Sequence, residues 1–312
     1  LKKWKIKGPI DDILNQLRIK KKEPEPKYSM LDPALNLSYL NQHLQLWLDA
    51  SNIDGQYNTS LKSGQNISYW RDLSINMNHA KQKNINYFPR FYKQSHQNFP
   101  GVHFYNDHLD IPSLLNVGQR KARTIVVAFK ANTQTNKQGN GILALNGTGV
   151  GSPQIKGRKY VVTSEPAIRV QGDVQYYATL SPGINLLVHK NAPNAYVYDS
   201  ISFLNGERLK RISGVNKQIN IIGYTTRIGS FQLDRWLDGN IYEIMIFDTE
   251  LTQQEVTRLQ AYLMRKWNIE KTPILKKEEP TRPTIIKDPP KPQKDKIEDQ
   301  KEMEENIKNL QK

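Results

Sequence analysis

The chain has 312 residues, no cysteine and a net charge of +15. The lack of thiols excludes a disulfide scaffold, a thiolate metal site and a cysteine nucleophile. No apolar run reaches the roughly 18 residues of a membrane-spanning helix, so the sequence predicts none. The chain starts at Leu1, and we expect either processing or earlier residues that would hide a targeting segment.

Residues 1–27 form a basic arm with nine Lys/Arg against four Asp/Glu. Apolar side chains at i, i+3, i+4 and i+7 predict a short amphipathic helix in it, made by Ile10, Ile13, Leu14 and Leu17. Two turns of helix are marginal alone, so we expect this helix to dock on other proteins of an assembly. Packing back onto the chain's own main domain is the alternative. A Pro-containing linker ends the arm.

Residues 28–270 show short apolar runs separated by Gly, Pro, Asn and Asp, the pattern of an all-β domain. The predicted strands are 44–49, 102–105, 124–131, 142–146, 159–163, 167–171, 184–190, 195–204, 218–224 and 239–248. A helix follows the last strand, because residues 252–255 form a capping box and apolar side chains then share one helical face. That face is made by Val256, Leu259, Leu263 and Trp267.

Residues 271–312 form a second tether. Six prolines precede Gln293, which predicts a stiff polyproline-like spacer, and a highly charged stretch follows. Because the two tethers together carry only +7, a charge of +8 remains, dispersed over the middle of the chain. A polyanion is therefore not the favoured partner, and solubility is the simpler explanation of the charge.

Two sets of motifs carry a family resemblance. The runs LWLDAS at 46–51, SYWRDLS at 68–74 and GVHF at 101–104 resemble the opening of laminin-G-like modules of the concanavalin A-like lectin/glucanase superfamily. The run DGNIYEIMIF at 238–247 and the helix ending YLMRKW at 262–267 look like the close of the same modules. The resemblance implies an antiparallel β-sandwich, or jelly roll, closed by one C-terminal helix. It also implies that Trp47, Trp70 and Trp267 pack in the core.

Enzymatic function is not expected. Glycosidases of the superfamily that this chain resembles carry two carboxylates on one strand, at the separation that bond cleavage needs. The nearest candidate is Glu243, whose same-face neighbours we predict to be Ile241 and Met245, with no second carboxylate. Glu243 is therefore interpreted as structural. The chain also has no H-E-x-x-H pair and no G-x-S-x-G elbow.

A carbohydrate site needs an aromatic platform for a sugar face, with Asp or Asn nearby to bind hydroxyl groups. Trp236, between Asp234 and Asp238, is the first candidate, and Tyr105 with Asp107 is the second. Packing against a loop is the alternative for Trp236.

The metal content is left open by the sequence. Calcium prefers oxygen ligands, and its candidate ligands here are Asp49, Asp54, Asp107 and Asp238. His103 and His108 flank one loop and are a weaker candidate pair, with ordinary loop histidines as the alternative. No other cofactor is expected.

The sequence thus predicts a non-enzymatic structural or adhesion protein that displays a lectin-like sandwich on a large assembly, with a virion as its location. The alternative is a secreted or cell-surface carbohydrate-binding module, and an enzyme comes third. Its expected partners are other structural proteins bound through the two arms, and a glycan.

Overall fold

The computed structural model describes residues 37–113, 115–132, 140–145, 160–164, 167–170, 174–177, 180–213, 218–221, 225–230 and 236–271. The chain divides into two compact units, Leu1–Thr272 and Pro273–Lys312, and every described residue belongs to the first. The predicted docking residues Ile10, Ile13, Leu14 and Leu17 lie outside the described residues, as do the Pro-rich spacer and the charged tail.

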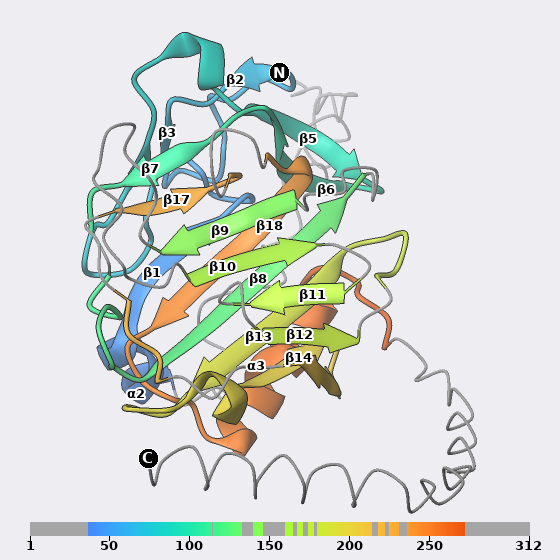
Figure 1. Cartoon of the computed structure of the whole chain (residues 1–312). Coiled ribbons are helices and arrows are strands. Elements are labelled where there is room, and N and C mark those ends of the chain that lie inside the picture. The colour runs from blue at the N-terminus through green and yellow to red at the C-terminus, as the bar shows by residue number, and fades with distance from the viewer. Residues whose placement is uncertain are drawn as a thin grey trace, which may run out of the picture. The chain divides into compact units, whose positions relative to one another are not determined.

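Two antiparallel sheets make the domain (Figure 1). Sheet A has the strand order β15 (Glu207–Arg208), β14 (Ile201–Leu204), β13 (Asn185–Asn191), β8 (Arg123–Ala131), β18 (Asp238–Phe247), β6 (Phe99–Tyr105), β5 (Arg90–His96) and β2 (Gln65–Asn66). A further strand, β1 (Leu44–Asp49), also pairs with β18. Since β18 pairs with β6 through residues 238–241 and with β1 through residues 243–247, these two strands share one edge of it.

Sheet B packs against sheet A. Its order is β16 (Arg211–Ser213), β12 (Val174–Tyr177), β11 (Ala167–Val170), β10 (Tyr160–Ser164), β9 (Asn140–Leu145), β17 (Thr226–Ile228), β7 (Leu109–Ile111), β4 (Ala80–Lys81) and β3 (Tyr69–Trp70). The predicted antiparallel β-sandwich with one C-terminal helix is therefore confirmed.

Strand alternation places the core between the sheets. Leu46 and Leu48 of β1 are fully buried opposite Ile246 and Ile244 of β18. Because neighbouring side chains on a strand point to opposite faces, Trp47 and Asp49 lie on the other face of sheet A. We call this second face the outer face. It carries the charged and polar side chains of the candidate site.

Helix α3 (Gln253–Lys266) covers part of the outer face and contacts β13 (Figure 1). Its predicted capping box is present, because Thr252 Oγ1 accepts from the backbone N–H of Glu255 and the Glu255 carboxylate accepts from the Thr252 backbone. Val256, Leu259 and Leu263 are buried as predicted. Three shorter helices are described: α2 (Leu37–His43) and the 3₁₀ turns η1 (Ile85–Tyr87) and η2 (Val197–Asp199). No described helix is long and apolar enough to cross a membrane.

Loop 70–78 covers the edge of β1 that faces away from β18. Asp72 Oδ1 accepts from Trp47 N at 2.8 Å, and Leu73 N donates to Trp47 O at 2.8 Å. Other side chains of the loop donate to carbonyl oxygens along the strand: Asn76 to Leu44, Asn78 to Gln45 and Trp70 to Asp49. This loop therefore satisfies the backbone groups that an exposed edge strand would offer to another chain.

One glycine is required where the chain turns from sheet B toward β18. Gly229 has φ +83°, and a Cβ there would lie 2.2 Å from Cδ1 of Phe104. The contact also shows that Phe104 of β6 points between the sheets. His103 and Tyr105, its neighbours on β6, therefore point to the outer face.

Candidate functional site

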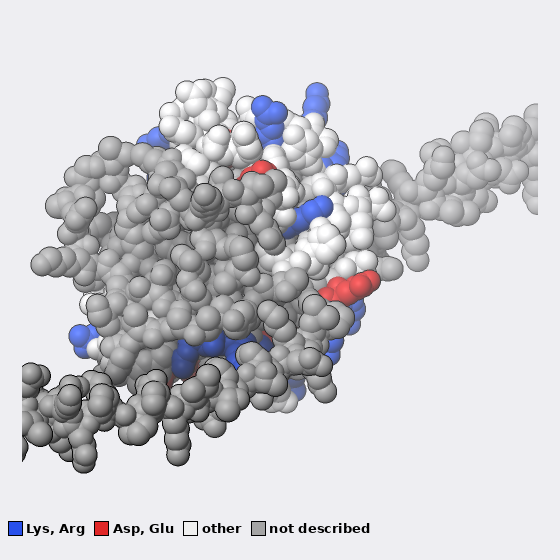
Figure 2. All heavy atoms as spheres, turned by 45° about the vertical axis from the view of Figure 1, so that its right-hand side comes forward, with Lys and Arg blue, Asp and Glu red and all other residues white. Residues whose placement is uncertain are grey.

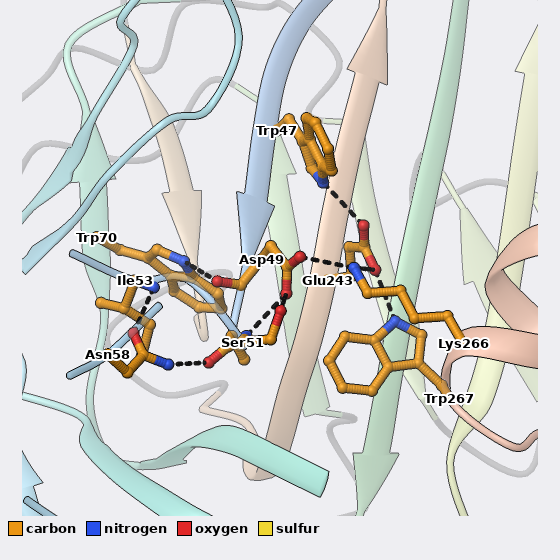
Figure 3. A network of polar contacts seen from close by, with 10 residues as sticks. Trp47, Asp49, Ser51, Ile53, Asn58, Trp70, Glu243, Lys266 and Trp267 are labelled. Atoms are coloured by element: carbon orange, nitrogen blue, oxygen red, sulfur yellow. Dashed lines mark hydrogen bonds and ion pairs between the residues drawn. The ribbon is translucent and has the colours of Figure 1, made fainter. Parts of the chain in front are cut away.

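Three charged side chains meet on the outer face beneath α3 (Figure 3). Lys266 Nζ lies 2.6 Å from Asp49 Oδ2 and 2.7 Å from Glu243 Oε2. The lysine comes from the last turn of α3, and the two carboxylates are directly paired across β1 and β18. Their side chains are only 4%, 8% and 2% exposed, respectively, so water has almost no access to this cluster.

The remaining carboxylate oxygens of this buried cluster are also satisfied. The indole of Trp47 donates to Glu243 Oε1 at 2.8 Å, and that of Trp267 donates to Glu243 Oε2 at 2.6 Å. Asp49 Oδ1 accepts from both the backbone N–H and the hydroxyl of Ser51. Trp47 and Trp267, together with Trp70, are at most 7% exposed, which confirms the burial predicted for them. Trp47 and Trp267 are buried on the outer face, at the end of α3, rather than between the sheets.

Protonation in the buried cluster follows from burial and from the close opposite charges. Burial raises the pKa of Glu243, opposed by the ammonium of Lys266. Burial alone would lower the pKa of Lys266, but the two carboxylates outweigh it and raise the pKa above its ordinary value. Lys266 therefore stays charged at any physiological pH.

A β-bulge explains how Glu243 reaches α3. Between Ile241 and Glu243 the register with β8 slips by one residue, so that Tyr242 is extra. Ile241 pairs with Val102 and Phe129 in the core, whereas Glu243 points to the outer face. One expectation is thus wrong, because Ile241 is not a same-face neighbour of Glu243. Strand β18 places no second carboxylate next to Glu243, as predicted, but the adjacent strand β1 supplies Asp49. Glu243 itself is enclosed in a structural network, as interpreted from the sequence.

The rest of the outer face carries a row of polar side chains that crosses four strands. Arg90 of β5 pairs with His103 of β6, His103 with Asn240 of β18, and Asn240 with Lys130 of β8. We call these four residues the polar row. Phe99 of β6, in edge contact with Trp267, lies at the boundary between the row and the part covered by α3.

Next to the polar row, three of the predicted site residues come together. Tyr105, 62% exposed, is paired across the strands with Asp238, whose Oδ1 accepts from the Asn132 amide at 3.1 Å. Asp107 Oδ2 accepts from Tyr105 N at 3.0 Å. Burial raises the pKa of Asp107, partly offset by that hydrogen bond and by the charges of His103 and Arg90. This arrangement offers an aromatic surface beside carboxylate and amide groups.

Trp236 is half-buried beside two other rings. Its ring stacks on Tyr87 at 5.8 Å and lies 5.6 Å from the ring of His108. These contacts fit the alternative of packing against a loop, and the role of Trp236 in sugar binding stays a prediction. Asp234, its predicted acidic neighbour, lies outside the described residues.

The candidate metal ligands do not converge. Among the described residues no group of three or more His, Cys, Asp or Glu side chains is placed to hold a metal ion. Asp49 is bound by Lys266, and Asp54 accepts hydrogen bonds from its own loop. His103 contacts the ring of Tyr92, whereas His108 is buried against Gln82, so the two histidines do not form one site.

Sequence reasoning missed Arg90, Lys130, Asn240 and His96 as members of the outer face. They come from three strands that are far apart in the sequence, β5, β8 and β18, and only the strand register brings them together. Lys130 Nζ lies 3.2 Å from Nδ1 of His96, so His96 extends the set toward the end of β5.

No family model matches the sequence, and no curated protein matches it. Among solved structures, domain 4 of an extracellular arabinanase from Geobacillus stearothermophilus is similar at 11% identity and a TM-score of 0.43, over 64% of this chain and 100% of that one. The Trypanosoma rangeli sialidase is similar at 14% identity and a TM-score of 0.42, over 72% of this chain and 33% of that one.

A third similar structure is the binding domain of Paraclostridial Mosquitocidal Protein 1. Its identity is 11% and its TM-score 0.47, over 73% of this chain and 55% of that one. Similarities of this strength do not bear on function, so the functional argument rests on the residues of this chain.

Proposed function

We propose that this chain is a non-catalytic carbohydrate-binding module, a lectin-like sandwich of the concanavalin A-like, laminin-G-like kind, whose site lies on the outer face around Tyr105. One observation carries the proposal. Tyr105 is 62% exposed and directly opposite Asp238, whose carboxylate accepts a hydrogen bond from the Asn132 amide. Sugars are bound by aromatic rings that cover their apolar faces and by carboxylate and amide groups that bind their hydroxyls.

The non-catalytic part of the proposal is supported by the state of the paired carboxylates. Asp49 and Glu243 are the described acids that lie closest to the arrangement of a glycosidase, but α3 buries both and Lys266 binds both. A general acid or a nucleophile must reach its substrate, and these groups cannot without displacement of the helix.

Attachment to a larger assembly, with a virion as the location, belongs to the same proposal as the setting in which the module would act. Its support is the pair of charged tethers, residues 1–27 and 271–312, in the sequence. Either display on a virion or secretion to a cell surface is compatible with a sugar-binding face.

The test is a glycan array probed with the full chain, with Tyr105→Ala as the site variant. We expect the wild-type chain to bind a defined set of glycans and Tyr105→Ala to lose about tenfold in affinity, the scale of one lost aromatic contact. Tyr57→Ala is the matched control, because Tyr57 is similarly exposed, at 66%, in a loop outside the proposed site. Absence of glycan binding by the wild-type chain, or equal losses in both variants, would refute the proposal.

A further inference from the structure

The polar row is a linear arrangement of fixed spacing. Its four members occupy adjacent strands in register, so three inter-strand steps separate Arg90 from Lys130. With strands about 4.8 Å apart, the row is about 14 Å long at the backbone. Tyr105 and Asp238 form the next row along the same strands, so the two rows adjoin.

Both ends of the row carry positive charge that no described carboxylate neutralises by direct contact. Lys130 Nζ is bonded to the ring of His96, a group without negative charge. Arg90 is exposed and forms no ion pair with a described acid, although its charge acts to lower the pKa of Asp107. By contrast, Lys266 and Arg227, also in the described part of the chain, are each bound to a carboxylate.

Two histidines lie beside these charges. His103 lies between Arg90 and Asn240 in the row, and Tyr92 packs edge-on against its ring. Burial and the charge of Lys130 lower the pKa of His96, as expected where the local potential is already positive. On the side of the molecule that Figure 2 shows, blue Lys and Arg side chains are scattered over the described surface, with few red Asp and Glu side chains among them.

We infer that the ligand of the outer face is an acidic glycan, whose carboxylate or sulfate groups bind along the polar row while a neutral sugar unit lies on Tyr105. The inference rests on the proposed function and specifies its ligand class. Arginine and lysine bind such groups through charge-assisted hydrogen bonds, and the exposed Arg90 and the half-buried Lys130 lie at the two ends of the row. Asn240, between them, is only 7% exposed and is not expected to contact the ligand.

A glycan fits this face better than a nucleic acid. Asp107 and Asp238 lie beside the row, and their carboxylates would repel the evenly spaced phosphates of a polynucleotide. A glycan with acidic groups on some units and hydroxyl groups on others matches a surface on which basic side chains lie next to carboxylates.

The experiment measures binding of the full chain to four probes at two salt concentrations. These are a sulfated oligosaccharide, a uronic acid oligosaccharide, an uncharged oligosaccharide of the same length and a single-stranded oligodeoxynucleotide. We expect at least one acidic oligosaccharide to bind about tenfold or more tightly than the uncharged one, with an advantage that shrinks as salt rises.

The double variant Arg90→Gln/Lys130→Gln should abolish this preference but keep the weaker binding of the uncharged oligosaccharide through Tyr105. The matched control is Arg208→Gln/Lys210→Gln, which removes two exposed charges at β15 and just beyond it, at the opposite end of sheet A. This control should retain the preference.

The possible failures are separable. Equal binding of acidic and uncharged oligosaccharides by the wild-type chain overturns the inference but leaves the proposed function standing. Tighter binding of the oligodeoxynucleotide than of either acidic oligosaccharide also overturns the inference. If no oligosaccharide binds, both the inference and the proposed function fail.

Discussion

Lys266 is the counter-ion of two carboxylates that would otherwise repel each other inside the protein. A buried ion cluster adds little over an apolar one of the same shape, but removal of one partner leaves buried charge uncompensated. Asp49 and Glu243 would then have to take up protons or draw in water. The cluster therefore joins the end of α3 to strands β1 and β18.

We predict that Lys266→Met destabilises the domain by about 3–5 kcal/mol, the scale for breaking a buried ion pair. The measurement is the free energy of unfolding in urea. Arg258→Met, an exposed change on the same helix, is the control and should cost no more than about 0.5 kcal/mol. The triple variant Asp49→Asn/Glu243→Gln/Lys266→Met should recover much of the loss, because no charge remains buried. Similar small losses of unfolding free energy in Lys266→Met and Arg258→Met would contradict this stabilising role of the cluster.

At this scale the sequence predicted the burial of three tryptophans, because they stand in motifs that resemble those of laminin-G-like modules. It also predicted a structural role for Glu243, because the neighbouring positions on its strand carry no second carboxylate. It could not predict the partnership with Asp49 and Lys266, which depends on strand register and on where a helix ends. It also misplaced Ile241, since a bulge of one residue reverses the faces of a strand and leaves no mark in the alternation of side chains.

Strand β1 depends on loop 70–78 to bind the backbone groups along its free edge. Asp72 is 2% exposed and accepts from the backbone N–H groups of Trp47, Ser74 and Asn78. It thereby fixes the turn that places Asn76 and Asn78 on the strand edge. The motif at 68–74 thus has a physical reason, because it seals the edge of the first long strand.

We predict that Asp72→Ala costs about 2–3 kcal/mol, since buried backbone donors lose their acceptor, and that the opened edge promotes self-association. Thermal unfolding and light scattering would measure the two effects. Asp54→Ala is a suitable comparison, because Asp54 accepts similar hydrogen bonds in an exposed loop that covers no strand. A comparable loss in both variants, without association in either, would count against this role of Asp72.

Strand prediction succeeded where a strand is long and apolar and failed where it is short or polar. The seven-residue strand β5 was not predicted, because most of its side chains are polar. The strand predicted at 44–49 is confirmed at its predicted bounds, and that at 239–248 within one residue at either end. The two-residue strands β2, β3 and β4 were not predicted, because two residues show no period. Within the strand predicted at 218–224, Gln218 and Ile221 form only isolated bridges, and residues 222–224 lie outside the described part.

At the scale of the whole molecule, one sheet face serves two purposes. Where α3 covers it, the face carries buried charges that are fully paired; beyond Phe99 and Trp267 it carries the polar row and Tyr105. Composition alone could not distinguish the two parts, because both are rich in polar and aromatic residues. The division is made by the position of α3, whose start the capping box at 252–255 marks and whose end Lys266 binds to the sheet.

The arms can be tested separately from the sandwich. The described hydrophobic core runs from Leu40 to Ile269, so we expect residues 28–270 to fold without the tethers. If the arms attach the module to an assembly, the full chain isolated from its native source should travel in a stoichiometric complex, whereas residues 28–270 should sediment as a folded monomer.

A second variant distinguishes the predicted helix from the Pro-rich tail as the attachment device. It replaces Ile10, Ile13, Leu14 and Leu17 by Ser in the full chain, so that only the helix loses its apolar side chains. Loss of the complex in this variant assigns attachment to the helix, and retention assigns it to residues 271–312. Monomers for both the full chain and the trimmed domain would reject attachment and leave the sugar-binding face as the basis of function.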